Sequence, residues 1–199
     1  DSLGRDVLSR LIHASRIALI VAFVASVIAC LIGTVLGLAA GYLGGWWDII
    51  VSRLIDIWMA FPPVLLSILL VAVLGSGLHS VIVAIAVIDW KRFARVVRAE
   101  AQQQARLEYA EAATALGMSR GAILFREILP NCASAIAVKT SLDAGFVILI
   151  GASLSFLGLG IQPPTADLGT MVSDGAEYLP DYWWESMLPG AVILFVALG

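Results

Sequence analysis

Long uninterrupted apolar runs dominate the chain and predict helices that cross a membrane. Residues 17–43 contain no charged side chain, and about 20 helical residues span the roughly 30 Å hydrocarbon core of a bilayer. A second uncharged run, residues 57–88, is too long for one untilted crossing and is divided by Gly75 and Gly77. Two such runs in 199 residues leave too little polar sequence to surround a large soluble core. We therefore expect an all-α, polytopic transmembrane helical bundle.

The pattern predicts five spans within a single transmembrane domain. They cover residues 17–43, 57–74, 78–98, 128–157 and 187–199, and a polar segment at 99–127 separates the third span from the fourth. The second span contains Pro62 and Pro63, and proline kinks a helix because it lacks an N–H. The last run reaches only about 20 Å at 1.5 Å per residue, which does not cross a bilayer. We expect the chain to be a fragment of a longer protein.

The distribution of charge predicts the orientation. Only 14% of residues are charged, whereas soluble domains have about 25%. Seven of the twelve Lys and Arg residues lie between Lys91 and Arg126, and residues 158–186 hold five acids and no basic residue. The positive-inside rule places the basic segment in the cytoplasm and the acidic loop outside. Counting spans then places residues 1–16 outside, although the three arginines of that segment favour the opposite side.

The cytoplasmic segment predicts a short helical hairpin. Residues 108–117 form a helical pattern with two acids in its first turn, where they suit the helix dipole. Gly117 stands where a helix end favours a left-handed residue, Ser119 can cap a following helix, and Pro130 stops that helix or opens the next span. Tyr109, Ala112 and Leu116 share one face of the first helix. Taken alone, this pattern also fits an ordinary amphipathic loop helix rich in alanine.

The spacing within this hairpin resembles the EAA signature of ABC importer permeases, E-A-A-x3-G-x9-I-x-L-P. The matching residues are Glu111, Ala112, Ala113, Gly117, Leu129 and Pro130. One position departs from the signature, because Glu127 stands where the signature has isoleucine. Four further stretches, residues 3–10, 39–46, 60–62 and 155–164, look like the peptide/nickel branch, the dipeptide and oligopeptide C-type permeases.

The resemblance implies a type I, MetI-like permease fold, whose complete form has six spans, so the first is absent here and the last is cut. It implies a transport subunit rather than an enzyme, located in a bacterial inner membrane. Its hairpin would dock on a separate cytoplasmic ATPase. That partner would hold ATP and magnesium, because this chain has no phosphate-binding G-x-x-x-x-G-K-[ST] loop of its own. The docking residues carried over are Glu108, Glu111, Ala112, Ala113, Leu116, Gly117, Leu129 and Pro130.

The same resemblance implies a second permease subunit and a periplasmic or lipid-anchored substrate-binding protein as partners, besides membrane lipid. Short peptides are the expected cargo, with nickel or another small solute as the alternative. A secondary transporter driven by an ion gradient is disfavoured by the EAA spacing, and no catalytic constellation of an intramembrane enzyme is found. The sequence shows neither a nucleic-acid-binding character nor metal-ligand spacing around its two histidines and two cysteines.

Lys139 and Asp143 stand four residues apart within the fourth span, where charge is costly. They either line the translocation path or neutralise each other at a helix–helix interface, and we favour the interface. Asp89 is expected to be an interfacial anchor at the end of the third span.

Two patterns predict helix contacts. Gly33, Gly37 and Gly41 repeat every four residues, a face of small residues suited to close packing against another span. Lys91, Arg95 and Arg98 form a basic face that suits lipid headgroups or the rim of the ATPase.

Overall fold

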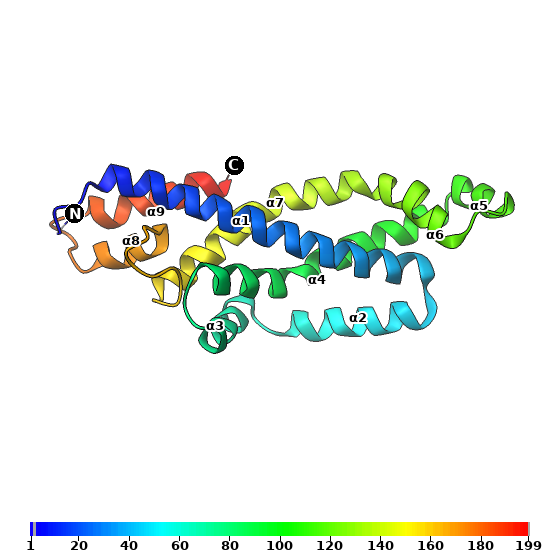
Figure 1. The fold of residues 1–199 in the computed structure, drawn as a ribbon, viewed down its shortest axis with the longest axis horizontal. Helices are drawn as coiled ribbons and strands as arrows, with labels where there is room; N and C mark the ends of the chain where they lie inside the picture. Colours follow the sequence, from blue (N-terminus) through cyan, green and yellow to red (C-terminus); the bar gives the residue numbers. More distant parts are fainter. Residues whose placement is uncertain (2, 199) are drawn as a thin grey trace. The chain divides into compact units, whose positions relative to one another are not determined.

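A computed structural model describes residues 1 and 3–198, and these residues are mostly helical, with no strand among them (Figure 1). The prediction of an all-α fold is confirmed. In chain order the elements are α1 (Val7–Leu38), the π-helix η1 (Ala39–Leu43), α2 (Gly45–Ala60), α3 (Pro63–Leu74), α4 (Leu78–Gln104), α5 (Glu108–Ala115), α6 (Arg120–Ile123), the π-helix η2 (Leu124–Ile128), α7 (Leu129–Phe156), α8 (Leu168–Ala176) and α9 (Trp184–Leu198).

The chain divides into two compact units. Unit 1 consists of Asp1–Ser26, Pro62–Ile88 and Leu142–Gly199, and unit 2 consists of Val27–Phe61 and Asp89–Ser141. Helices α1, α4 and α7 each contribute one part to each unit. All of the EAA-like residues fall in unit 2.

Two helical stretches of the described chain are long and apolar enough to cross a membrane, Val7–Leu43 and Arg120–Phe156. They contain or overlap the predicted first and fourth spans. The predicted third span corresponds to the first part of α4. This helix is not apolar enough to count as a membrane span, because its first 18 residues contain four charged side chains, Asp89, Lys91, Arg92 and Arg95. The predicted fifth span corresponds to α9, which has only 15 described residues.

The predicted second span, 57–74, is not one continuous helix. Helix α2 ends at Ala60, Phe61 and Pro62 are extended, and α3 begins at Pro63. Neither proline has an N–H to donate to the preceding turn, and proline disfavours the helical conformation of the residue before it. The two helices pass as a membrane span only when they are taken together as a broken pair.

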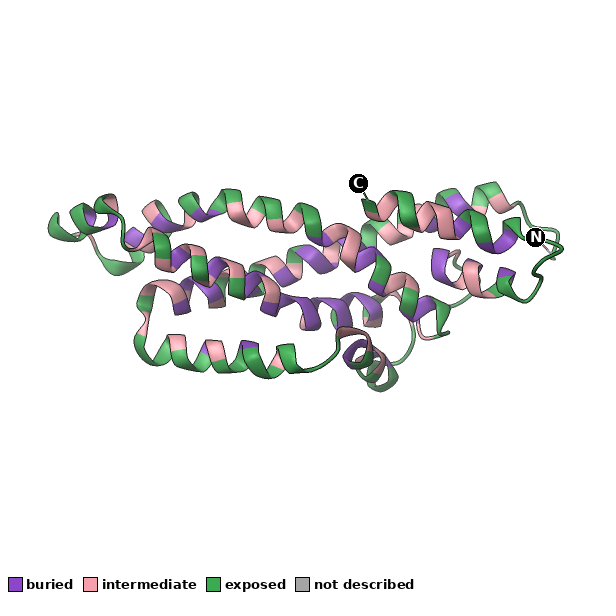
Figure 2. Cartoon of the chain, turned by 180° about the vertical axis from the view of Figure 1, so that it is seen from behind, coloured by how far each residue is buried: buried purple, intermediate pink, exposed green. Residues whose placement is uncertain are grey.

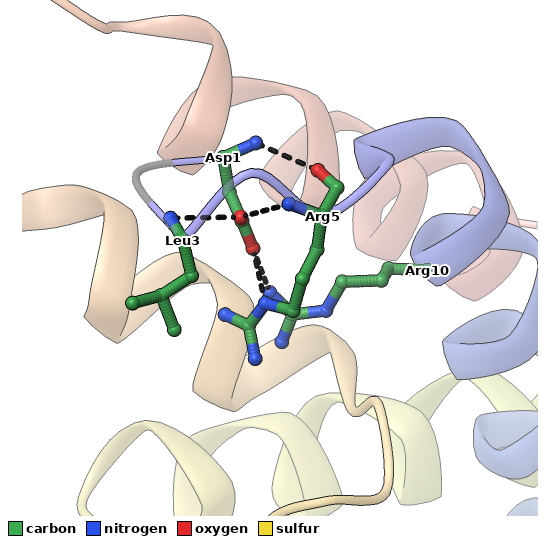
Figure 3. A network of polar contacts seen from close by, with 4 residues as sticks. All are labelled: Asp1, Leu3, Arg5 and Arg10. Carbon is green, nitrogen blue, oxygen red and sulfur yellow. Dashed lines mark hydrogen bonds and ion pairs between the residues drawn. The ribbon is translucent and has the colours of Figure 1, made fainter.

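Unit 1 begins with a tight turn held by one carboxylate (Figure 3). The Asp1 side chain accepts backbone N–H groups of Leu3 at 3.1 Å and Arg5 at 2.8 Å, and it pairs with the guanidinium groups of Arg5 at 2.7 Å and Arg10 at 2.6 Å. These contacts fix the polar segment that leads into α1.

The predicted outer loop, residues 158–186, contains a helix that the sequence pattern missed. Asp167 caps α8 by accepting the N–H of Thr170 at 3.1 Å. Helix α8 packs against α9, where the Ser186 hydroxyl donates to the Val172 carbonyl at 3.1 Å. Asp167 and Glu185 are buried, so the acids of this loop do not all form an exposed face.

Unit 2 is built on the close approach of α1 to α4, and buried residues gather on the central part of α4 (Figure 2). A Cβ atom on Gly37 would lie 2.7 Å from the Ala94 carbonyl oxygen, and one on Gly41 would lie 2.6 Å from the Arg98 carbonyl oxygen. Gly33 meets Trp90, Phe93 and Ala94 in the same way. The prediction that these glycines pack against another helix is confirmed.

We expect Gly37→Val to push α1 away from α4 and to lower the stability of the protein by about 1–3 kcal/mol, the usual effect of overpacking. The matched control is Gly190→Val in α9, where a Cβ atom meets nothing within 4 Å. Thermal unfolding of both purified variants in detergent checks this, and equal midpoints would contradict the packing argument.

Candidate functional site

The predicted hairpin is present in unit 2, and its turn has the geometry that the sequence predicts. Gly117 adopts a φ of +78°. The N–H of Met118 donates to the carbonyl oxygen of Ala113 at 3.1 Å, and the N–H of Gly117 donates to the carbonyl oxygen of Thr114 at 3.0 Å. These two bonds form a Schellman motif at the C-terminus of α5. Ser119 then caps α6 through the N–H of Ala122 at 3.3 Å. The expected glycine turn and serine cap are therefore confirmed.

The eight expected docking residues are not equally accessible. Six of them are exposed and lie on the hairpin or at the start of α7: Glu108, Glu111, Ala112, Leu116, Gly117 and Pro130. Leu129 is half-buried, and Ala113 is only 6% exposed. The surface of the hairpin is thus formed by the acids, one alanine and the turn.

The buried face of α5 is made of small residues. Ala110 and Ala113 are buried, and Ala113 packs with Val97 and Ala101 of α4 and Ile128 of η2. On the predicted face of Tyr109, Ala112 and Leu116, the last two residues are exposed. The packed face of α5 is therefore the one that carries Ala110 and Ala113. Ala113 lies in the packed interface between the hairpin and α4, whereas the Leu116 side chain is 84% exposed.

Sequence reasoning missed a second exposed apolar side chain. Phe125 of η2 is 65% exposed although it lies in a polar segment, as Leu116 does. Together with Leu116, it gives the hairpin two large apolar side chains that are exposed. The sequence contains a signal for this exposure, because residues 119–127 hold one phenylalanine together with three charged residues.

The basic face of α4 binds α2, which corrects the expectation of a lipid or ATPase contact. Arg98 forms a two-pronged ion pair with Asp48, and Arg95 pairs with Asp56 at 3.2 Å. Lys91 is 2% exposed and donates to the carbonyl oxygen of Trp58 at 2.7 Å. The three cations thus hold α2 alongside α4 (Figure 1).

The bond from Lys91 has a clear physical cause. In a continuous helix the Trp58 carbonyl would accept the N–H of residue 62, but residue 62 is a proline and has none. The ammonium group of Lys91 fills that vacancy and places a positive charge at the negative end of α2.

Lys139 lies beside Asp89. Its Nζ atom is 4.0 Å from the Asp89 carboxylate and 4.4 Å from the centre of the Phe93 ring. Asp89 is 1% exposed and also lies 3.6 Å from Arg92. The expectation that Asp89 is an interfacial anchor is wrong, because its carboxylate is buried between cations.

Asp143 is placed in unit 1, where it is 1% exposed and accepts a hydrogen bond from the Ser26 hydroxyl at 3.4 Å. Within the described residues, no group of three or more His, Cys, Asp or Glu side chains is arranged to hold a metal ion.

Comparisons with known proteins agree with this fold. Residues 33–198 match the family described as the binding-protein-dependent transport system inner membrane component. The chain belongs to this family of membrane transport components.

Two solved structures share the fold at low sequence identity. A chain of the MetNI methionine ABC transporter in inward facing conformations aligns with a TM-score of 0.74 and 17% identity, over 95% of this chain and 92% of that one. A chain of an amino acid ABC transporter aligns with a TM-score of 0.70 and 20% identity, over 98% and 94%. The prediction of a MetI-like permease fold is confirmed.

Relatives of known name are more similar in sequence. The dipeptide transport system permease protein DppC of Alkalihalophilus pseudofirmus is 42% identical over all of this chain and 66% of its own length. The glutathione transport system permease protein GsiD of Pectobacterium atrosepticum is 45% identical, again over 66% of its length. The chain therefore spans just under two thirds of these relatives, and the resemblance to the peptide branch of the family is confirmed.

We expect Lys139→Leu to lower the amount of folded protein, because it leaves the buried Asp89 with less positive charge around it. Removing one member of a buried pair costs about 3–5 kcal/mol, whereas replacing both by neutral groups is far milder. The double variant Asp89→Asn/Lys139→Leu should recover most of the protein level, measured by detergent-extracted yield and thermal unfolding. If Lys139→Leu kept a normal level but abolished solute uptake, the translocation-path interpretation would be favoured instead.

Proposed function

We propose that this chain is part of the permease subunit of an ATP-driven importer in a bacterial inner membrane, and that it carries short peptides. The family match and the fold support the transport role. The cargo is supported by the names of relatives that transport dipeptides, di- and tripeptides and glutathione. The apolar stretches Val7–Leu43 and Arg120–Phe156 support the location in a membrane.

The observation that carries the coupling role is the exposure of Leu116. Its side chain is 84% exposed at the turn of the hairpin, and a leucine so placed gains free energy only when another surface covers it. We propose that this surface belongs to a separate cytoplasmic ATPase, which holds ATP and magnesium. Phe125 extends the apolar area that such a partner would cover.

The charges around Leu116 and Phe125 indicate which groups the complementary binding surface of the ATPase should carry. Glu108 and Glu111 are exposed on α5, and Arg120 and Arg126 are exposed on the second arm of the hairpin. A complementary groove would be apolar at its centre and would carry both basic and acidic groups at its rim. A second permease subunit and a substrate-binding protein complete the proposed assembly.

We expect Leu116→Ser to weaken ATPase binding by about tenfold or more, as truncation of a central apolar anchor does. Leu3→Ser is the matched control, because Leu3 is 72% exposed and lies in unit 1, outside the hairpin. Co-purification of the ATPase with each variant, expressed in the full protein, measures the effect. Equal retention of the ATPase by both variants would count against the docking role of the hairpin.

We expect the complete transporter, reconstituted in proteoliposomes with its binding protein, to accumulate a labelled dipeptide only when ATP is supplied. An ion gradient without ATP should produce no uptake, because the mechanical input comes from the ATPase. Uptake of nickel ions instead of the dipeptide would contradict the proposed peptide cargo. Uptake driven by the ion gradient alone would overturn the ATP-driven mechanism.

A further inference from the structure

Helix α5 is too short to hold its own position. It has eight residues, and isolated helices of that length are unstable in water. Its N-cap is Leu107, which offers no side-chain cap to the first turn. The angle of α5 to the rest of unit 2 must therefore be set by contacts with neighbouring elements.

A chain of polar side chains supplies such a contact between α5 and α4. The Tyr109 hydroxyl donates to the side-chain oxygen of Gln104 at 2.8 Å, and the Gln104 amide donates to the Glu100 carboxylate at 2.8 Å. Burial raises the pKa of the Tyr109 phenol, so the hydroxyl keeps its proton and remains a donor at physiological pH. The first turn of α5 is thus bonded to the last turn of α4 across the turn 105–107.

Helix α4 is in turn joined to the other helices of unit 2. It packs on Gly37 of α1 and on Gly41 of η1. It binds α2 through Arg98 and Asp48, and it lies beside α7 through Asp89 and Lys139. A displacement of α4 would therefore reach all three of these helices.

We propose that Tyr109 is a positioning residue for transport, which holds α5 at a fixed angle to α4 so that movement of the docked hairpin becomes movement of the helices of unit 2. This inference rests on the proposed coupling function and adds a specific contact to it. The buried alanines bring α5 close to α4, but methyl groups slide over one another easily. The directional hydrogen bonds of Tyr109 and Gln104 oppose that sliding.

Tyr109→Phe tests this proposal, because it removes one hydroxyl and leaves the ring. In the reconstituted complete transporter we expect ATP hydrolysis and ATPase retention to stay near wild type. The amount of dipeptide moved per ATP should fall about two- to tenfold, as expected when one hydrogen bond is lost. The matched control is Tyr42→Phe, since Tyr42 packs against the same core and no hydrogen bond of its hydroxyl is found among the described residues.

A double-mutant cycle separates positioning from packing. Gln104→Met removes the middle of the chain while it keeps the length of the side chain, and it should lower the transport-to-ATP ratio as Tyr109→Phe does. The double variant should be no worse than either single one. An unchanged ratio in Tyr109→Phe, or additive losses in the double variant, would overturn the proposal.

Failure of the broader function gives a different result. If the wild-type transporter moved no dipeptide with ATP, the proposed function itself would fail. If the wild type transported normally and Tyr109→Phe matched it, only the role of Tyr109 would fail. Loss of ATPase retention in Tyr109→Phe would mean that the residue serves docking, which also contradicts a positioning role.

Discussion

Helix α4 carries charged side chains among apolar helices, where neither hydrocarbon nor methyl groups can solvate them, so its buried charges need polar partners. Arg98 and Arg95 find acids on α2, Lys91 finds the carbonyl that Pro62 leaves open, and Asp89 lies next to Lys139 on α7. These requirements fix which helices surround α4. They also explain why a helix with so much charge is nevertheless largely buried.

The same helix supports the candidate coupling site. Its last turns pack against Ala113, and its last residue, Gln104, bonds to Tyr109. The hairpin is therefore an extension of α4 that exposes Leu116 and Phe125 while Ala110 and Ala113 face inward. In this arrangement the parts of the EAA-like motif have different tasks, since Ala113 sets the distance to α4 and the exposed residues form the surface.

Local features of the site could be predicted from the sequence because their causes are local. A glycine after a short helical pattern predicts a left-handed turn, and a serine two residues later predicts a cap. The partners of Lys91 and Arg98 could not be predicted, because they lie 33 and 50 residues away. The orientation of α5 was also beyond the pattern, since Ala112 and Ala113 are chemically identical and only the packing of α4 decides which one is buried. The broken second span could not be predicted either. Two adjacent prolines predict a defect in the helix, but they do not determine whether the helix is kinked or interrupted.

The proposed coupling requires α5 and α4 to move as one body when the proposed ATPase hydrolyses ATP. Spin labels at Ala99→Cys and Ala115→Cys, both exposed positions and both outside the proposed docking residues, would report the distance between the two helices by pulsed electron resonance, with Cys30 and Cys132 replaced. The account predicts one narrow distance distribution that is the same with and without ATP in the complete transporter. A distribution that shifts or broadens when ATP is added would contradict it.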